Sequence, residues 1–379
     1  MLKKILSVIS ASVIMMSAVN VSAETISEEY SRSYVLMEAE THTVIRENNG
    51  DKRVKMGSFN KLMTVLLAAE AMDRGELSFE TELVASEHAN SMQGAQIWLM
   101  PGEKMTLGDL LKGVIIGNAN DACCVIAEKI GGSEEKFTEL MNSRAAELGM
   151  NDTLFIECTG YYGDDAQYTT AHDAALLLCE LSKHDELTEM FTSRIDELKD
   201  GDVQLVTTNR MGHRYKGSVG FKCGTGPSSG YFAAEGARRD DICFVTAVMD
   251  CPDEDIAIAL AMELLDIGFD GYMITSPPIP DDLPESILVK QGCAESVRLA
   301  VEPVGNVVVS KGSAGNITAR ISLPTGVYAP LKKGDKVGEL RLYIGKRLLK
   351  TCDICAAEDI CKKDFENVLS EMLKNLFCF

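Results

Sequence analysis

The sequence predicts an α+β protein of two domains: a larger one that mixes helices and strands, and a smaller one built of strands. Three observations support this fold class. Apolar helical stretches and strand-like runs fill the chain up to about residue 274. Four of the ten prolines then fall between Pro277 and Pro284, which is typical of a stiff linker. Beyond the linker, apolar residues alternate with polar ones, as they do in half-buried strands.

The first residues predict a secretory signal peptide. Lys3 and Lys4 form a basic start, residues 5–16 are apolar or small, and Ala23 ends a small-x-small pattern. We therefore expect residues 1–23 to be removed and the protein to be exported. A buried N-terminal helix is the alternative, because the apolar stretch is short for a membrane span.

Periodicity and stop signals define the elements of the first domain, residues 24–274. Strand-prone runs occupy residues 34–37, 43–46 and 242–249. Apolar residues at helical spacing predict helices at about residues 58–72, 107–116, 119–130, 137–148, 170–182 and 253–267. Gly75, Gly132 and Gly149 follow three of these stretches, as glycines do at helix ends.

The rest of the chain divides into a linker at residues 275–285, a β-rich domain at 286–357 and a terminal segment at 358–379. In the last segment, apolar residues recur from Phe365 to Phe377 on one face of a helix, with lysines nearby. This pattern predicts an amphipathic helix. It could lie on a membrane surface, or it could pack on the β-rich domain.

Charge and cysteine content exclude some classes of function. The formal net charge of -20 repels phosphate backbones, so nucleic acid is not an expected partner. The twelve cysteines are scattered and several lie in apolar runs, so we expect unpaired thiols rather than a disulfide framework. Cys352 and Cys355 have zinc-like spacing but no second pair, and no histidine pair has metal spacing; no metal site is predicted.

Ser58 and Lys61 are the candidate nucleophile and base. Three residues apart at the start of a helix, their side chains share a face. A serine hydroxyl needs a neighbouring base, and a lysine serves only if burial lowers its pKa from ~10.4 toward ~7–8. Ser133 and Lys136 have the same spacing, but Ser133 fits the cap of a polar helix start.

Two further motifs separate Ser58 from Ser133. Asn118-Ala119-Asn120 and Lys222-Cys223-Gly224 follow Ser58-x-x-Lys61 in an order that resembles the penicillin-binding proteins and serine β-lactamases. Matches elsewhere are similar to the low-molecular-weight D-Ala-D-Ala carboxypeptidases of peptidase S11 type and cover nearly the whole mature chain. They lie at residues 101–103, 109–111, 120–122, 148–155, 168–173, 230–231 and 329–338.

The resemblance implies a β-lactamase/transpeptidase-like domain, with an antiparallel sheet flanked by helices, then a small all-β domain. It implies that Ser58 attacks the bond between the terminal D-alanines of a peptidoglycan stem peptide, or a β-lactam antibiotic. Backbone N–H groups of Ser58 and Thr225 would bind the oxyanion, and no cofactor is required. It assigns catalysis to Ser58, Lys61, Asn118 and Asn120, and substrate binding to Lys222, Gly224 and Thr225.

Three departures from the family pattern leave alternatives open. Asn118 stands where Ser is usual and could instead cap a helix. Cys223 stands where Thr is usual, so Thr225 could supply the hydroxyl for the substrate carboxylate. Glu157-Cys158 replaces a usual Asn-Pro. One alternative function is therefore a wall-peptide-binding relative without turnover. The other is a β-lactamase, for which Glu157 is the nearest candidate deacylating base.

Overall fold

The structure is a computed structural model and describes residues 33–162, 166–225 and 229–364. The predicted signal peptide and the apolar stripe from Phe365 onward lie outside these residues. Residues 358–364 were predicted to begin the terminal helix, and this is wrong for them: Ile360 bridges to Leu331 and Lys362 to Gly292 in extended chain.

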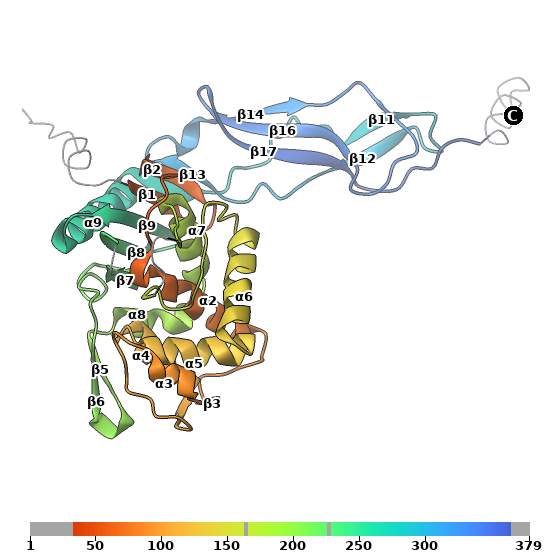
Figure 1. The fold of residues 1–379 in the computed structure, drawn as a ribbon. Helices are drawn as coiled ribbons and strands as arrows, with labels where there is room; N and C mark the ends of the chain where they lie inside the picture. Colours follow the sequence, from red (N-terminus) through yellow and green to blue (C-terminus); the bar gives the residue numbers. More distant parts are fainter. Residues whose placement is uncertain (1–32, 163–165, 226–228, 365–379) are drawn as a thin grey trace, which may run out of the picture.

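A five-stranded antiparallel sheet forms the centre of the larger domain (Figure 1), with strand order β2-β1-β9-β8-β7. The strands are β1 (Ser33–Glu38), β2 (Thr43–Asn48), β7 (Ser218–Gly224), β8 (Tyr231–Arg239) and β9 (Ile242–Cys251). The predicted strands correspond to β1, β2 and β9. Because the first two strands pair beside the last, the sheet joins the two ends of the domain, and β7 is left as an edge strand.

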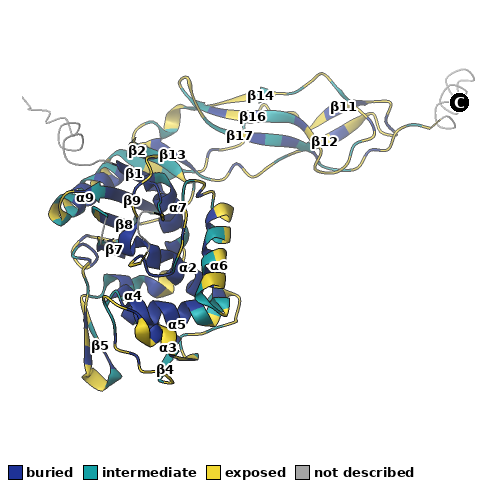
Figure 2. Cartoon of the chain, in the orientation of Figure 1, coloured by how far each residue is buried: buried dark blue, intermediate teal, exposed yellow. Residues whose placement is uncertain are grey.

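Helices cover both faces of this sheet, and its inner strands β1, β8 and β9 are therefore mostly buried (Figure 2). The helix α9 (Glu254–Gly271), capped by Asp253, packs its Leu260 and Leu264 on one face. On the other face lie α2 (Lys61–Asp73) and α7 (Ala171–Leu181). Ten of the thirteen residues of α2 are buried, so this helix is apolar on nearly every side and runs through the core. Its first residue is the predicted base.

A helical region extends from α2 away from the sheet. It contains α3 (Glu87–Ser91), α4 (Leu107–Ile115), α5 (Asn120–Gly131), α6 (Glu134–Glu147) and α8 (Thr188–Thr192), with short 3₁₀ turns at Gly57–Asn60, Asp185–Leu187 and Lys199–Gly201. Two small antiparallel sheets accompany it: β3 (Glu82–Val84) with β4 (Lys104–Thr106), and β5 (Ile195–Leu198) with β6 (Val203–Val206). Side-chain caps fix the helix starts: Thr106 accepts from the Asp109 N–H, and Ser133 from the Lys136 N–H.

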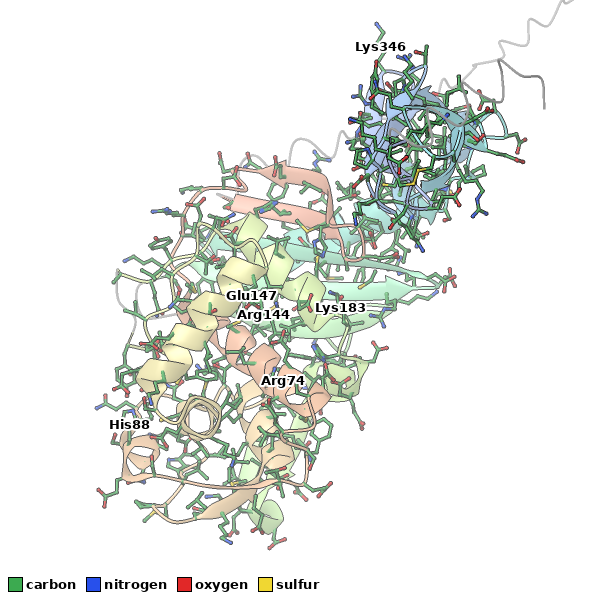
Figure 3. The ribbon with its side chains drawn as sticks, turned by 90° about the vertical axis from the view of Figure 1, so that its right-hand side faces the viewer. Arg74, His88, Arg144, Glu147, Lys183 and Lys346 are labelled. Carbon is green, nitrogen blue, oxygen red and sulfur yellow. A yellow bond between two sulfur atoms is a disulfide. The ribbon has the colours of Figure 1, made fainter. Side chains whose placement is uncertain are left out.

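Ion pairs link α6 to the helices beside it, and Figure 3 labels Arg144, Glu147 and Lys183 of this group. The Arg144 guanidinium lies 2.7 Å from Glu70 of α2, 3.1 Å from Glu147 and 3.2 Å from Glu180 of α7. Lys183 also contacts Glu180. Because Arg144 is half-buried and contacts carboxylates of two other helices, this group holds α6 in place more firmly than a single exposed pair would.

The smaller domain is a six-stranded sheet with its own apolar core. Its strand order is β14-β16-β17-β12-β11-β15. The strands are β11 (Ser286–Lys290), β12 (Ser296–Val301), β14 (Ile317–Ser322), β15 (Val327–Tyr328), β16 (Lys336–Ile344) and β17 (Arg347–Ala356), with a 3₁₀ turn at Ala314–Asn316. Between β12 and β14, β13 (Val307–Ser310) leaves this sheet and pairs with β10 (Tyr272–Thr275) at the end of the larger domain. The two domains are therefore joined twice, by the linker and by this strand pair.

The cysteine prediction is partly wrong. Cys293 and Cys361 form a disulfide across 68 residues of the smaller domain. The other nine cysteines of the described chain are free thiols, eight of them buried, and Cys355 is half-buried. Within the same residues, no helix combines the length and apolarity needed to cross a bilayer.

Candidate active site

Ser58 lies in the 3₁₀ turn that leads into α2, at the junction of α2 and the edge strand β7. Its side chain is 7% exposed, and its N–H donates to Thr225 O at 3.4 Å. Across this junction, a Cβ placed on Gly224 would come within 2.8 Å of Ser58 Oγ. The strand backbone can therefore approach the hydroxyl this closely only because residue 224 has no side chain.

Lys61 begins α2, one helical turn beyond Ser58. The side chain is 2% exposed, and its Nζ donates to Thr159 O at 2.7 Å. Burial lowers the pKa of Lys61 below its usual value, since a charged amine loses solvation there. Thr159 was not a predicted site residue, because a backbone carbonyl leaves no mark in a sequence motif.

Lys222 brings a second buried amine to the same place. It lies on β7, is 4% exposed, and precedes the glycine that faces Ser58 by two residues. Burial, and then the charge of Lys61, lower the pKa of Lys222 to about 7. Because two positive charges repel each other, the charge of Lys61 disfavours a second proton on Lys222.

Asn120 is the first residue of α5 and is 2% exposed. Its Nδ2 donates to Gln93 O at 2.5 Å, and its Oδ1 has no hydrogen-bond partner within the described ranges. Cys123, three residues on along the same helix face, is close enough for its charge to act on the Lys61 pKa. This face of α5 is thus turned toward the amine, with an unpaired amide oxygen at its start.

Asn118 is not the cap of α5. The cap position belongs to Ala119, which has no side-chain oxygen, so that alternative is wrong. Asn118 instead has a φ of 57°, a left-handed conformation that Asn tolerates better than most residues. Its Oδ1 is buried and has no partner in the part of the chain that the structure describes.

Cys223 faces away from the two lysines, because side chains alternate along a strand. Its thiol donates to Glu235 Oε1 at 3.0 Å, and burial raises the pKa of Glu235 to about 8. The thiol therefore does not occupy a place where it would meet a substrate carboxylate. Thr225 does not simply replace the missing hydroxyl either, since its Oγ1 donates to the carbonyl oxygens of Ser229 and Gly230.

Glu157 holds the loop that presents Thr159 O to Lys61. Its carboxylate accepts from the Thr159 N–H at 2.7 Å, the Thr159 hydroxyl at 2.6 Å and the Gly160 N–H at 2.5 Å. Gly160 has no room for a side chain, because a Cβ would meet Gly57 O at 1.8 Å. These hydrogen bonds hold the loop that carries the Thr159 carbonyl. Because the Glu157 carboxylate is occupied by them, it is poorly placed to activate water.

The arrangement can perform nucleophilic acyl transfer. It combines a nearly buried hydroxyl, two amines whose pKa values are lowered, and backbone groups of Ser58 and Thr225 beside one another. The structure brings together Ser58, Lys61, Lys222, Gly224 and Thr225, and directs the α5 face of Asn120 toward them.

Two family descriptions match this chain. Residues 18–253 match the family described as D-alanyl-D-alanine carboxypeptidase. Residues 280–362 match the C-terminal domain of penicillin-binding protein 5.

Curated relatives align over nearly the whole length. The D-alanyl-D-alanine carboxypeptidase DacF of Bacillus subtilis is 31% identical over 347 residues, which are 90% of this chain and 89% of that protein. The D-alanyl-D-alanine carboxypeptidase DacC of Escherichia coli is 28% identical over 87% of this chain and 84% of its own length.

Solved structures share the fold. Penicillin-binding protein 5 from Haemophilus influenzae superposes with a TM-score of 0.78 at 22% identity, covering 88% of this chain and 98% of that one. Penicillin-binding protein D2 from Listeria monocytogenes, solved in its cefotaxime-bound form, superposes with a TM-score of 0.57 at 25% identity, over 63% of this chain and 97% of its own.

Proposed function

The chain belongs to the D-alanyl-D-alanine carboxypeptidase family of serine hydrolases, and from this premise we propose that Ser58 removes the terminal D-alanine of peptidoglycan stem peptides through an acyl-serine. One observation carries the proposal. The Ser58 hydroxyl lies between the start of α2, with Lys61 one turn on, and the glycine backbone of β7, two residues beyond Lys222.

In the acylation step, Ser58 Oγ attacks the carbonyl carbon of the bond between the two D-alanines, and its proton passes to Lys61 Nζ. The oxygen that becomes negative is stabilised by the N–H groups of Ser58 and Thr225, and the Ser58 N–H gives up its long hydrogen bond to Thr225 O to do so. One such donor is typically worth ~10²–10³ in rate. D-Alanine leaves as its nitrogen takes a proton. Water then attacks the acyl-serine, and the shortened peptide leaves with Ser58 restored.

Lys222 and Asn120 orient the peptide in this scheme. A protonated Lys222 attracts the terminal carboxylate that distinguishes a D-alanine end from the rest of the peptide. The unpaired Oδ1 of Asn120 can accept a hydrogen bond from a peptide N–H or from Lys61. With Asn118 replacing the usual serine, proton transfer to the leaving amine falls to Lys61, Lys222 or water.

The same site should react with β-lactams, since a relative of this fold is described in a cefotaxime-bound form. Action on peptidoglycan would place the protein outside the cytoplasm, in keeping with the predicted signal peptide. Contact of the terminal helix with a membrane surface stays a prediction, because that helix lies outside the described residues.

Mass spectrometry of the intact protein with penicillin tests the proposal. We expect a long-lived adduct on the peptide that contains Ser58. Ser58→Ala should abolish the adduct and lower carboxypeptidase activity by about 10³-fold or more, with a nearly unchanged thermal midpoint. The matched control is Ser133→Ala, which removes the serine of the second Ser-x-x-Lys pair and should keep the adduct.

Other results of the penicillin experiment would indicate one of the alternative functions. Rapid drug hydrolysis without an accumulated adduct would indicate a β-lactamase, and no adduct on the folded wild-type protein would indicate a wall-peptide-binding relative. An adduct that persists in Ser58→Ala would mean that another residue is the nucleophile.

A further inference from the structure

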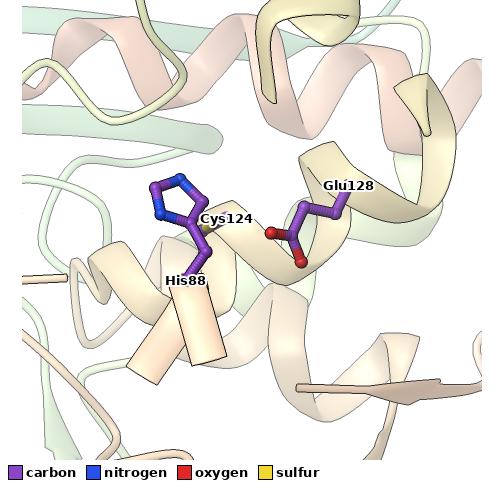
Figure 4. Close-up of side chains that lie close together, drawn as sticks. All are labelled: His88, Cys124 and Glu128. Carbon is purple, nitrogen blue, oxygen red and sulfur yellow. The ribbon is translucent and has the colours of Figure 1, made fainter. Parts of the chain in front are cut away.

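Nitrogen, sulfur and oxygen donors converge at a place that the proposed reaction does not use (Figure 4). One ligand atom each from His88, Cys124 and Glu128 lie within 4.8 Å of one another. The thiol is buried, the carboxylate is half-buried, and the imidazole is exposed. The cluster is therefore buried at Cys124 and open to solvent at His88.

Two helices supply these donors. Cys124 and Glu128 are four residues apart on α5, so their side chains lie on one face of that helix. His88 comes from α3, whose cap residue Ser86 donates its hydroxyl to Glu128 Oε1 at 2.9 Å. The helix that carries the imidazole is thus already attached to the carboxylate.

A carboxylate also contacts the imidazole. Glu134, at the start of α6, has its Oε2 2.8 Å from His88 Nε2. Histidines that bind metals usually have a carboxylate or carbonyl partner on one ring nitrogen, which fixes the ring and leaves the other nitrogen to the ion. Glu134 can act in this way when the ion binds His88 Nδ1.

We propose that His88, Cys124 and Glu128 form a binding site for a divalent zinc-type metal ion. Zinc takes thiolate, imidazole and carboxylate ligands at roughly 2.0–2.3 Å in a tetrahedral arrangement, for which the separations among these donors leave room. Water from the open side completes the four ligands. Binding replaces the thiol proton of Cys124, which is released to solvent.

Neighbouring clusters fit an ion less well. The group of Glu134, Glu157 and Cys158 has no nitrogen donor, and its Glu157 carboxylate accepts three hydrogen bonds from its own loop. The group of Asp73, His184 and Glu186 has no sulfur donor. Only the cluster on α3 and α5, among the three groups found in the described residues, combines nitrogen, sulfur and oxygen donors.

The ion would join α3 to α5, and α5 begins with Asn120. Its expected effect is on the stability of this helical region, since no ligand residue belongs to the Ser58 site. At about a hundred times the dissociation constant, added Zn²⁺ should raise the thermal midpoint by roughly 5–10 °C.

Cobalt titration of the full chain, freed of metal by a chelator, tests the site directly. Co²⁺ bound to a thiolate gives a sulfur-to-metal charge-transfer band in the near ultraviolet. We expect this band to saturate at one equivalent per chain, to disappear when Zn²⁺ is added, and to be lost in Cys124→Ala. His88→Ala changes an exposed residue and should weaken binding at least tenfold even if Cys124→Ala folds poorly.

Two matched thiol variants locate the ion. Cys179→Ala removes a buried thiol elsewhere and should leave the band intact. A band that survives Cys124→Ala but is lost in Cys158→Ala would place the ion in the neighbouring cluster and overturn the assignment, as would the absence of any band in the wild-type protein.

Discussion

At the scale of single residues, two amines share one enclosed site. At low pH both Lys61 and Lys222 carry a proton, and Ser58 has no base. At high pH neither does, and the substrate carboxylate has no cation to meet. If Lys61 is the base and Lys222 the cation for the substrate carboxylate, as proposed, the working state holds one proton between the pair, and burial lowers the pKa of both amines from their usual alkaline range.

We predict a bell-shaped pH dependence of penicillin acylation, with its maximum near neutral pH. Lys222→Arg keeps a permanent cation, so the fall on the alkaline side should move to higher pH while the rise on the acid side stays. The peak rate should remain within about tenfold of wild type, or ~1.4 kcal/mol in activation free energy. Stopped-flow acylation rates across pH measure this.

The exposed Lys216→Arg serves as the matched control for Lys222→Arg and should leave both limbs in place. An alkaline limb that does not move in Lys222→Arg would show that another group titrates there.

Sequence spacing predicted the candidate catalytic side chains that the structure brings together, and missed groups that contribute through backbone or packing. Ser58 and Lys61 were found because one helical turn aligns them. Thr159 was missed because its contribution is a carbonyl oxygen. Glu235 was missed because its partner Cys223 comes from another strand, and no local pattern reports a contact made across a sheet.

At the scale of elements, the site depends on how closely strand β7 approaches the start of α2. Helix positions were predicted to within a few residues, since caps and glycine stops are local signals. Strands β7 and β8 were not predicted. β8 is rich in alanine and glycine, which have low strand propensity, so its conformation comes from pairing with β7 and β9.

Gly224→Ala should distinguish the effect of the close contact between β7 and Ser58 on acylation from any effect on the stability of the fold. The new Cβ would come within 2.8 Å of Ser58 Oγ and displace the hydroxyl. We expect penicillin acylation to slow by about 10²-fold, because a misplaced nucleophile loses its alignment with the carbonyl. Acylation kinetics and the thermal midpoint, measured together, check this.

Gly271→Ala at the end of α9 is the control, since a Cβ there meets no atom within 4 Å. If Gly224→Ala is acylated as fast as the control, the close contact between strand and nucleophile has no catalytic role.

At the scale of the whole molecule, the larger and smaller domains have separate cores but are connected by the pairing of β10 with β13. The linker and the β texture of the second domain were predictable from prolines and alternation. The pairing of β13 with a strand of the larger domain was not predictable, because the partner of a four-residue strand is set by the tertiary structure and not by local sequence.

Removing the disulfide should weaken the smaller domain and spare the catalytic site. Closure of a 68-residue loop is worth about 4 kcal/mol in the chain-entropy account. We predict that replacing Cys293 and Cys361 by serine lowers the calorimetric transition of the smaller domain and leaves penicillin acylation unchanged. Cys355→Ala, at a half-buried free thiol, should change neither quantity. A large loss of acylation in the double variant would instead couple the two domains energetically.

The burial of eight cysteine thiols in the described chain affects how long this protein stays folded outside a reducing environment. While the protein stays folded, oxidants reach most of these buried sulfur atoms only when the structure opens locally. Each opening that exposes them allows non-native disulfides to form, and these disulfides prevent refolding. Irreversible crosslinking therefore accumulates with the number of opening events, and the lifetime of the protein in air is set by the thiol-bearing segment that opens most often.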